Sequence, residues 1–171
     1  MRNRIVTFLV LVTALSVFIP AIGYSSENEI NRESIRGMKG VHVVFEKLGQ
    51  GEYRDGLAAD LILKDVELRL RKNGITVLTE AGMRIYPGNP LLYININSIK
   101  INNVKAYMYS LSIELEQSVT LERNKMPMRA VTWNLGVVKY TPANKLNNVR
   151  KDIKELVDRF INAYLSVNPK E

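Results

Sequence analysis

The stretch that decides the fold is Tyr107–Leu121, YMYSLSIELEQSVTL, in which two kinds of side chain alternate. Most odd-numbered positions are apolar or aromatic, and most even-numbered positions are polar. Alternate residues of a β-strand point to opposite faces, so this period of two predicts one long strand with a buried and a solvated face. The polar positions are Ser110, Ser112, Glu114, Glu116, Ser118 and Thr120.

Two neighbouring stretches show the same alternation. Leu91–Ile101 alternates before the long strand, and Val131–Val137 alternates after it with Val131 and Trp133 in the apolar phase. Short turns at Asn102–Asn103 and Arg123–Lys125 separate the three strands. Connections this short cannot carry the chain back along a sheet, so we predict an antiparallel meander.

The N-terminal half predicts a strand, a helix and a second strand. Apolar residues alternate over Gly40–Phe45, recur at helical spacing over Gly56–Asn73, and return in Ile75–Leu78. Asp55 is the expected N-cap of the helix, and Gly74 suits the left-handed conformation that ends it. A strand–helix–strand unit of this length implies a right-handed crossover between parallel strands.

A second long helix is predicted near the C-terminus. It opens at Thr141–Pro142 and stops at Asn168–Pro169, whereas Thr79–Pro90 is expected to be mostly loop. The predicted order is β-α-β-β-β-β-α within a single domain, residues 40–168. We expect an α+β fold, a two-layer sandwich in which a mixed, mostly antiparallel sheet carries two helices on one face.

The first two dozen residues are typical of a secretory signal peptide. Arg2 and Arg4 precede the apolar run Ile5–Ile19, whose fifteen residues are short for a membrane span. Cleavage is predicted after Gly23, or alternatively after Ser25, so that residues 1–23 are removed and the protein is periplasmic or secreted. The alternative is an uncleaved N-terminal anchor. The polar residues 24–39 are expected to form a linker or mobile arm.

The composition excludes several classes of site. The chain has no cysteine, which removes disulfides, thiolate metal sites, cysteine nucleophiles and lipid attachment at a cysteine. His42 is the single histidine, so neither a histidine-based metal triad nor a catalytic triad can be assembled from this chain. We expect His42 on the solvated face of its strand, and we expect no metal and no cofactor.

The charge pattern does not favour nucleic acid as a partner. The formal net charge is +7, and removal of Arg2 and Arg4 with the leader lowers it to +5. The remaining Lys and Arg residues are spread along the chain among Asp and Glu, which indicates a solvated surface. We expect no nucleic-acid partner, and membrane contact only through partners or an uncleaved N-terminal segment.

Two patterns invite a catalytic interpretation. Gly49-Gln50-Gly51 lies between a strand and a helix, as phosphate-binding loops do, but no Gly-Lys-Ser/Thr follows, so a plain turn is favoured. Glu114 and Glu116 share one face of a strand and could form a glycosidase pair. Such chemistry needs a cleft and a raised pKa on one carboxyl group, so solvation is favoured.

Three aromatic residues invite a binding interpretation. Tyr107, Tyr109 and Trp133 could form a platform on which a sugar stacks. All three lie in the apolar phase of their strands, and aromatic side chains at such positions are usually buried. We therefore predict that they pack in the core.

The order of elements resembles that of two kinds of small envelope domain. The export signal, the helix ending in Leu70-Arg71-Lys72-Asn73-Gly74-Ile75, the meander and the long C-terminal helix look like the N-terminal part of TolB-type proteins and like LptE-type lipopolysaccharide-assembly proteins. The ending Phe160–Leu165 resembles that of uncharacterised exported bacterial proteins. The resemblance implies an α+β domain of the cell envelope and assigns no functional residue.

We expect a non-catalytic interaction or accessory module of a bacterial envelope assembly, whose partner is another envelope protein. The alternative is a carrier that holds a small apolar or glycan ligand between sheet and helices, and a carboxylate-based hydrolase is least favoured. Sheets with an open face and an unpaired edge bind proteins there. The predicted interaction face is the polar, helix-free face formed by Ser110, Ser112, Glu114, Glu116, Ser118 and Thr120.

Overall fold

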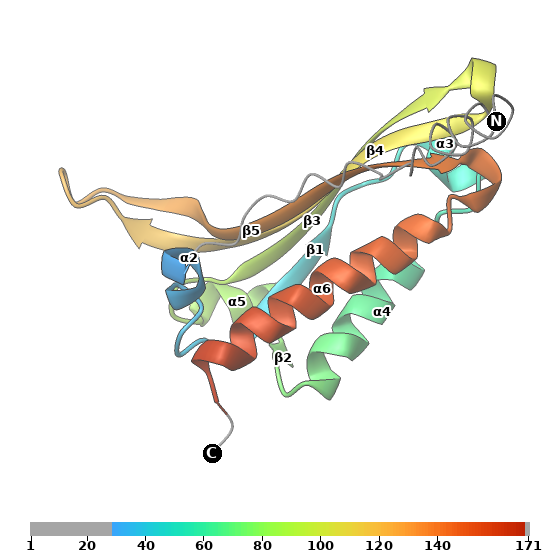
Figure 1. The fold of residues 1–171 in the computed structure, drawn as a ribbon. Helices are drawn as coiled ribbons and strands as arrows, with labels where there is room; N and C mark the ends of the chain where they lie inside the picture. Colours follow the sequence, from blue (N-terminus) through green and yellow to red (C-terminus); the bar gives the residue numbers. More distant parts are fainter. Residues whose placement is uncertain (1–28, 170–171) are drawn as a thin grey trace, which may run out of the picture.

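The computed structural model describes residues 29–169. The predicted signal peptide, residues 1–23, lies outside the described residues. Five strands form one sheet in the order β2-β1-β3-β4-β5 (Figure 1). Their bounds are β1 Gly40–Phe45, β2 Thr76–Val77, β3 Leu91–Ile101, β4 Ala106–Thr120 and β5 Pro127–Pro142.

The pairing of the strands confirms the predicted sheet. β1 is parallel to both β2 and β3, whereas β3, β4 and β5 are antiparallel neighbours. The two long helices, α4 (Ala59–Lys72) and α6 (Asn148–Val167), lie side by side under one face of the sheet (Figure 1). The protein therefore has the predicted α+β fold with a mixed, mostly antiparallel sheet.

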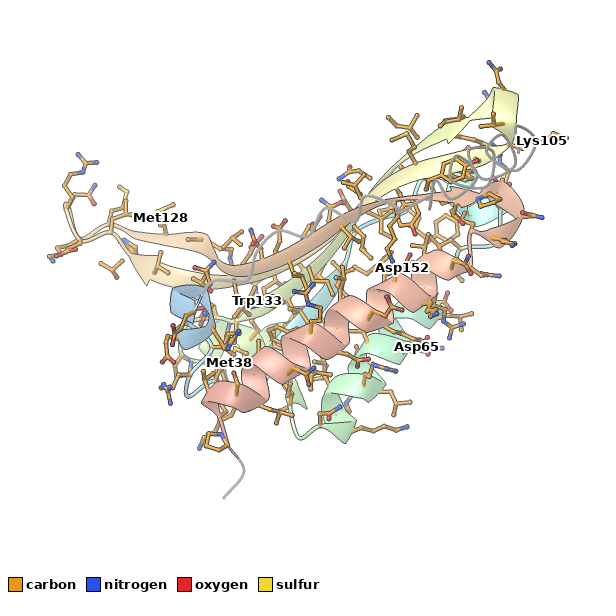
Figure 2. The ribbon with its side chains drawn as sticks, viewed as in Figure 1. Met38, Asp65, Lys105, Met128, Trp133 and Asp152 are labelled. Atoms are coloured by element: carbon orange, nitrogen blue, oxygen red, sulfur yellow. The ribbon has the colours of Figure 1, made fainter. Side chains whose placement is uncertain are left out.

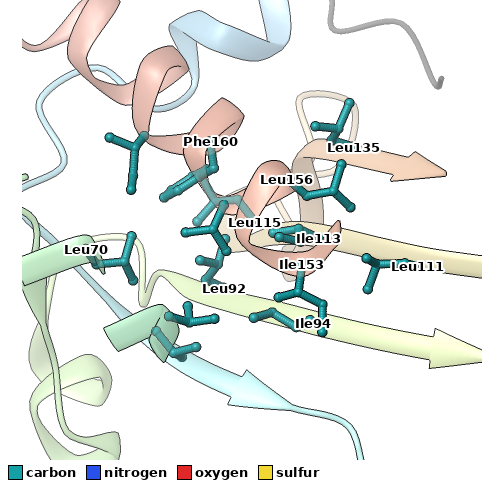
Figure 3. Packing of buried hydrophobic residues seen from close by; sticks show 14 of the residues in the cluster. Leu70, Leu92, Ile94, Leu111, Ile113, Leu115, Leu135, Ile153, Leu156 and Phe160 are labelled. Carbon is teal, nitrogen blue, oxygen red and sulfur yellow. The ribbon is translucent and has the colours of Figure 1, made fainter. Parts of the chain in front are cut away.

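The core fills the space between this sheet and the two long helices. Apolar side chains of β3, β4 and β5 meet those of α6, as Figure 3 shows for Ile113, Leu115 and Leu156. Trp133 is fully buried, and its ring meets that of Phe160 edge-on with 5.2 Å between the ring centroids. Burial of Tyr107, Tyr109 and Trp133 confirms that these aromatic residues belong to the core.

Three short helices occupy segments where the sequence predicted none. They are α2 (Glu29–Glu33), α3 (Gln50–Arg54) and α5 (Glu80–Ile85). The segment expected to be loop at Thr79–Pro90 contains α5, because the Thr79 hydroxyl caps the helix by accepting a 3.0 Å hydrogen bond from the Gly82 amide.

The expected linker or mobile arm, residues 24–39, needs a correction where the structure describes it. Its part from Glu29 onward forms α2 and then buries Ile35 and Met38 in the core. A hydrogen bond joins this segment to the end of α6, because the side-chain Nδ2 of Asn168 donates to the Ile35 carbonyl at 3.1 Å. These two apolar side chains make residues 29–39 part of the folded domain.

Two predicted helix starts are also corrected. Asp55 is not the N-cap of α4, because that helix begins only after Ala58. Asp55 instead follows the end of α3, and its carboxylate accepts hydrogen bonds from Lys100 and Tyr107. The C-terminal helix does not open at Thr141–Pro142, because β5 runs on to Pro142 and a 3-10 turn, Ala143–Lys145, intervenes.

A β-bulge changes the facing of residues in β5. Trp133 pairs with Leu115, and Val131 pairs with Glu116, the next residue of β4. Thr132 is therefore an extra residue in β5 that has no paired residue in β4. Trp133 points into the core, whereas Val131 is exposed. The prediction that Val131 shares the buried phase is therefore wrong.

Candidate interaction surface

The outer face is defined here as the side of β3, β4 and β5 that is opposite the core. The predicted residues of β4 lie on it, because they alternate with the buried Tyr109, Leu111, Ile113 and Leu115. The structure places all six predicted residues in one row along β4. Four of them, Ser110, Ser112, Glu114 and Glu116, are half-buried, and Ser118 and Thr120 are exposed.

An apolar row crosses the outer face at one end. Ile99 of β3 pairs with Met108 of β4, and Met108 pairs with Tyr140 of β5. Directly paired residues of antiparallel strands share a face, so these three side chains are neighbours. Ile99 is 72% exposed and Tyr140 57%, and the exposed Val138 stands one step farther along β5. These four residues are called the apolar row below.

Sequence reasoning missed the apolar row because it assessed the outer face from β4 alone. Ile99 follows Asn95 and Asn97 at intervals of two residues, so it points to the same, outer face of the sheet. This alternation could have predicted that Ile99 lies on the face of Met108, with which it pairs. The outer face is thus polar along most of β4 and apolar at one end.

Carboxylates gather at the other end of the outer face. Tyr93 of β3 pairs with Glu114, and its pKa is raised by burial and then by the negative charges of Glu46, Glu116 and Glu114. The Oε2 atom of Glu46 is buried without a hydrogen-bond partner among the described residues. Tyr93 and Ile99 are six residues apart in one strand, which separates the acidic end from the apolar row by roughly 20 Å.

The strand order leaves β5 at the edge of the sheet. Near the bulge this edge is partly covered, because the Ser34 hydroxyl donates to the Thr132 carbonyl at 3.3 Å. Gln117 ties the same place together: its Nε2 donates to the Ser34 carbonyl at 3.0 Å and to Thr132 Oγ1 at 2.8 Å. These hydrogen bonds therefore attach β5, near its bulge, to the segment around Ser34.

The remaining candidates from the sequence have structural explanations. His42 shares the face of Leu91, and its Nδ1 donates to the Leu78 carbonyl at 2.9 Å. Gly49 has an extended backbone and precedes the five-residue α3, so this segment is a plain helix start. Glu114 and Glu116 lie on the outer face of a strand, where Ser112 Oγ donates to Glu114 at 3.1 Å and Arg129 lies 3.7 Å from Glu116.

A buried charged cluster, which the sequence did not predict, lies between β5 and α6. Asp152 is buried; it accepts a hydrogen bond from the Tyr109 hydroxyl, and Lys139 Nζ lies 2.5 Å from its Oδ1. Burial, and then the hydrogen bond to Asp152, raise the pKa of Tyr109, which keeps this hydroxyl a neutral donor. A cavity of about 230 Å³ borders Lys139 and Asp152.

Two larger cavities lie on either side of the segment around Met38. Their volumes are about 490 Å³ and 530 Å³, and both are lined by Gly37, Met38 and Lys39. The first reaches Tyr86 and Gln117, and the second reaches Tyr164 and Pro169. Both cavities border the chain that leads into β1, whereas the space between the sheet and α6 is filled by apolar side chains (Figure 3).

Within residues 29–169, no three or more His, Cys, Asp or Glu side chains are grouped so that they could hold a metal ion. In the same part of the chain, no helix is long and apolar enough to cross a membrane. No protein-family model matches the sequence, and no match was found among curated proteins.

Proposed function

We propose that the protein is a non-catalytic interaction or accessory module of a bacterial envelope assembly, and that its outer face binds another envelope protein. The observation that carries this proposal is the apolar row of Ile99, Met108, Val138 and Tyr140, exposed beside a polar strand. Contiguous exposed apolar side chains rimmed by polar residues are typical of protein-binding surfaces.

The two ends of the outer face suit different parts of one interface. Tyr140 and Met108 are residue types that are enriched at the centres of interfaces, where they lose contact with water. The acidic end around Tyr93 would select a partner with basic side chains, because complementary charge orients partners and speeds their encounter.

The location in the envelope rests on the sequence. The basic and apolar leader, residues 1–23, and the resemblance to TolB-type and LptE-type domains both support an exported protein. The sequence has no cysteine at which a lipid could be attached. We expect a partner to hold the processed protein in the assembly.

A crosslinking experiment tests the proposal. A photo-reactive amino acid is placed at Val138 in the apolar row, or at Leu68, which is an exposed apolar residue of α4 and serves as the matched control. We expect a crosslink to one envelope protein from position 138 and none to that protein from position 68. Equal crosslinking from both positions would contradict the proposed surface.

Charge reversal tests the acidic end. Glu114→Lys combined with Glu116→Lys should leave the fold intact, because exposed and half-exposed strand positions away from the core affect stability little. It should weaken the crosslink from Val138 and make it less sensitive to salt. An unchanged crosslink across a salt series, at equal melting temperature, would remove the acidic end from the interface.

A further inference from the structure

The hairpin between β4 and β5 extends beyond the rest of the sheet. β3 accompanies β4 only as far as Glu116, whereas β5 pairs with β4 up to Thr120. Figures 1 and 2 show this two-stranded end projecting away from the body, with Met128 near its end and Lys105 at the opposite end of the sheet. The hairpin tip is defined here as Leu121–Met128.

The hairpin tip exposes apolar side chains that contact no core. Leu121, Met126 and Met128 are all exposed, Met126 to 57%. The two-stranded end that carries them is narrow and projects from the sheet (Figure 1). A protruding tip of this kind can bury its apolar side chains only by entering another phase or surface.

The hairpin tip also carries positive charge. Arg123 and Lys125 flank its turn, opposed by the single acid Glu122. Among the described residues, neither Arg123 nor Lys125 has a carboxylate within ion-pair distance, and the next cation, Arg129, lies 3.7 Å from Glu116. The two cations of the turn are therefore available to an external anion.

Backbone hydrogen bonds hold the turn in one shape. Leu121 N donates to the Met126 carbonyl at 2.9 Å, and Lys125 N donates to the Leu121 carbonyl at 2.8 Å. Lys125 adopts a left-handed backbone conformation, with φ of 57°. This closed turn presents the cations and the apolar side chains together.

We propose that the hairpin tip binds the surface of an anionic lipid membrane. Leu121, Met126 and Met128 enter the boundary between headgroups and acyl chains, and Arg123 and Lys125 contact lipid phosphates. A membrane fits better than an acidic protein, because the tip is convex and a fluid interface needs no shaped pocket to receive it. This surface adds to the membrane routes expected from the sequence and is independent of the proposed protein-binding face.

A fluorescent probe at the hairpin tip tests the proposal. Because the chain has no cysteine, Thr120→Cys allows an environment-sensitive dye to be attached beside Leu121 in the full chain. Asn103→Cys, at the opposite end of the sheet, is the matched control for membrane binding through any other segment. We expect a blue shift of the Thr120 probe with phosphatidylglycerol vesicles, and no shift with phosphatidylcholine vesicles or from the Asn103 probe.

Two variants separate charge from apolar insertion. Arg123→Gln with Lys125→Asn should weaken the apparent affinity about twenty-five-fold, at roughly five-fold for each cation removed near an anionic surface. Leu121→Ser with Met126→Ser and Met128→Ser should abolish the blue shift. The melting temperature of each variant checks its fold, because the side chains involved are exposed.

Three results would overturn the proposal. They are equal blue shifts with neutral and anionic vesicles, affinities unaffected by either variant, and no response of the Thr120 probe to any vesicle. The last result would leave an acidic protein surface as the partner that the same charges fit. None of these results would bear on crosslinking from Val138, so the two proposals fail separately.

Discussion

Asp65 of α4 accepts a hydrogen bond from Nε of Arg150 in α6, and Nζ of Lys154 lies 3.0 Å from the same carboxylate oxygen. One turn along α4, Arg69 bonds Asp158 of α6 at 2.5 Å. These ion pairs join the outward sides of the two long helices. The hydrogen bond from Arg150 is the main reason that the pKa of Asp65 is lowered to about 2.

The first prediction concerns acid stability. The folded pKa of Asp65 lies below its ordinary value of 3.8, so its contribution to stability is present above about pH 4 and is lost as the pH falls toward 2. Asp65→Asn should lower the free energy of unfolding by about 1 kcal/mol at pH 7, a figure reduced for the half-exposed Arg150. The difference from the wild type should shrink as the pH falls below 4 and should be mostly lost near pH 2.

Urea unfolding at a series of pH values measures this difference. Glu80→Gln is the matched control, because Glu80 pairs with Arg84 at the surface and both side chains are exposed. The control should change the free energy of unfolding little. A difference between Asp65→Asn and the wild type that is constant from pH 7 to pH 2 would contradict the assignment.

The second prediction concerns Trp133, the only tryptophan of the chain. Trp133→Ala should lower the free energy of unfolding by about 3–5 kcal/mol, because it leaves a cavity under the sheet. Trp133→Phe should cost less than half as much, since it retains a ring beside Phe160 and removes an indole N–H that has no hydrogen-bond partner among the described residues. Native fluorescence emission near that of free indole would show that the side chain is not buried.

The third prediction concerns the pairing of β1 with β2. A Cβ atom at Gly40 would lie 2.7 Å from the carbonyl oxygen of Thr76 in β2. This distance is too short for a non-bonded contact, and the oxygen cannot move away without disturbing the pairing of β2 with β1. Gly40→Ala should cost about 1–3 kcal/mol of stability. Gly51→Ala is the control: its Cβ would lie 3.5 Å from the Tyr107 hydroxyl, an ordinary contact within a helix. Melting temperatures that fall equally in both variants would count against this explanation.

The fourth prediction concerns the buried carboxylate of Asp152. Lys139→Met removes the cation that lies 2.5 Å from Asp152 and should cost about 2–3 kcal/mol, because a charge is then left without its partner. Asp152→Asn in the same background should recover part of that loss. Denaturant unfolding of both single variants and the double variant measures the coupling, and strictly additive losses would show that the two groups do not interact.

The long elements were predictable because each has a clear period. Leu91–Ile101 was predicted as a strand with the bounds that β3 has, and β4 was placed to within one residue at either end. α4 was predicted three residues too long at its start, because Ala58, rather than an acidic residue, precedes it. Short helices such as α5 carry too few residues for a period and were missed.

The parts of the outer face that sequence reasoning missed depend on register. The residue opposite Met108 is known only when the pairing of β3, β4 and β5 is known, and the bulge at Thr132 breaks the phase that relates Val131 to Trp133. The acidic end likewise joins residues of β3 and β4 with Glu46, which follows β1. A single strand showed which positions face outward, but not which side chains they meet.

The two-stranded end of β4 and β5 has a consequence for how the molecule opens. Beyond Ser118, whose amide still donates to the Gly88 carbonyl at 2.7 Å, β4 pairs with β5 alone and has no buried side chain. This ribbon should exchange its amide hydrogens far faster than Leu111–Leu115, by local fraying that leaves the rest folded. One continuous strand would then contain both the slowest and the fastest exchanging backbone of the sheet, so its outer part can change shape on contact while its inner part keeps the fold.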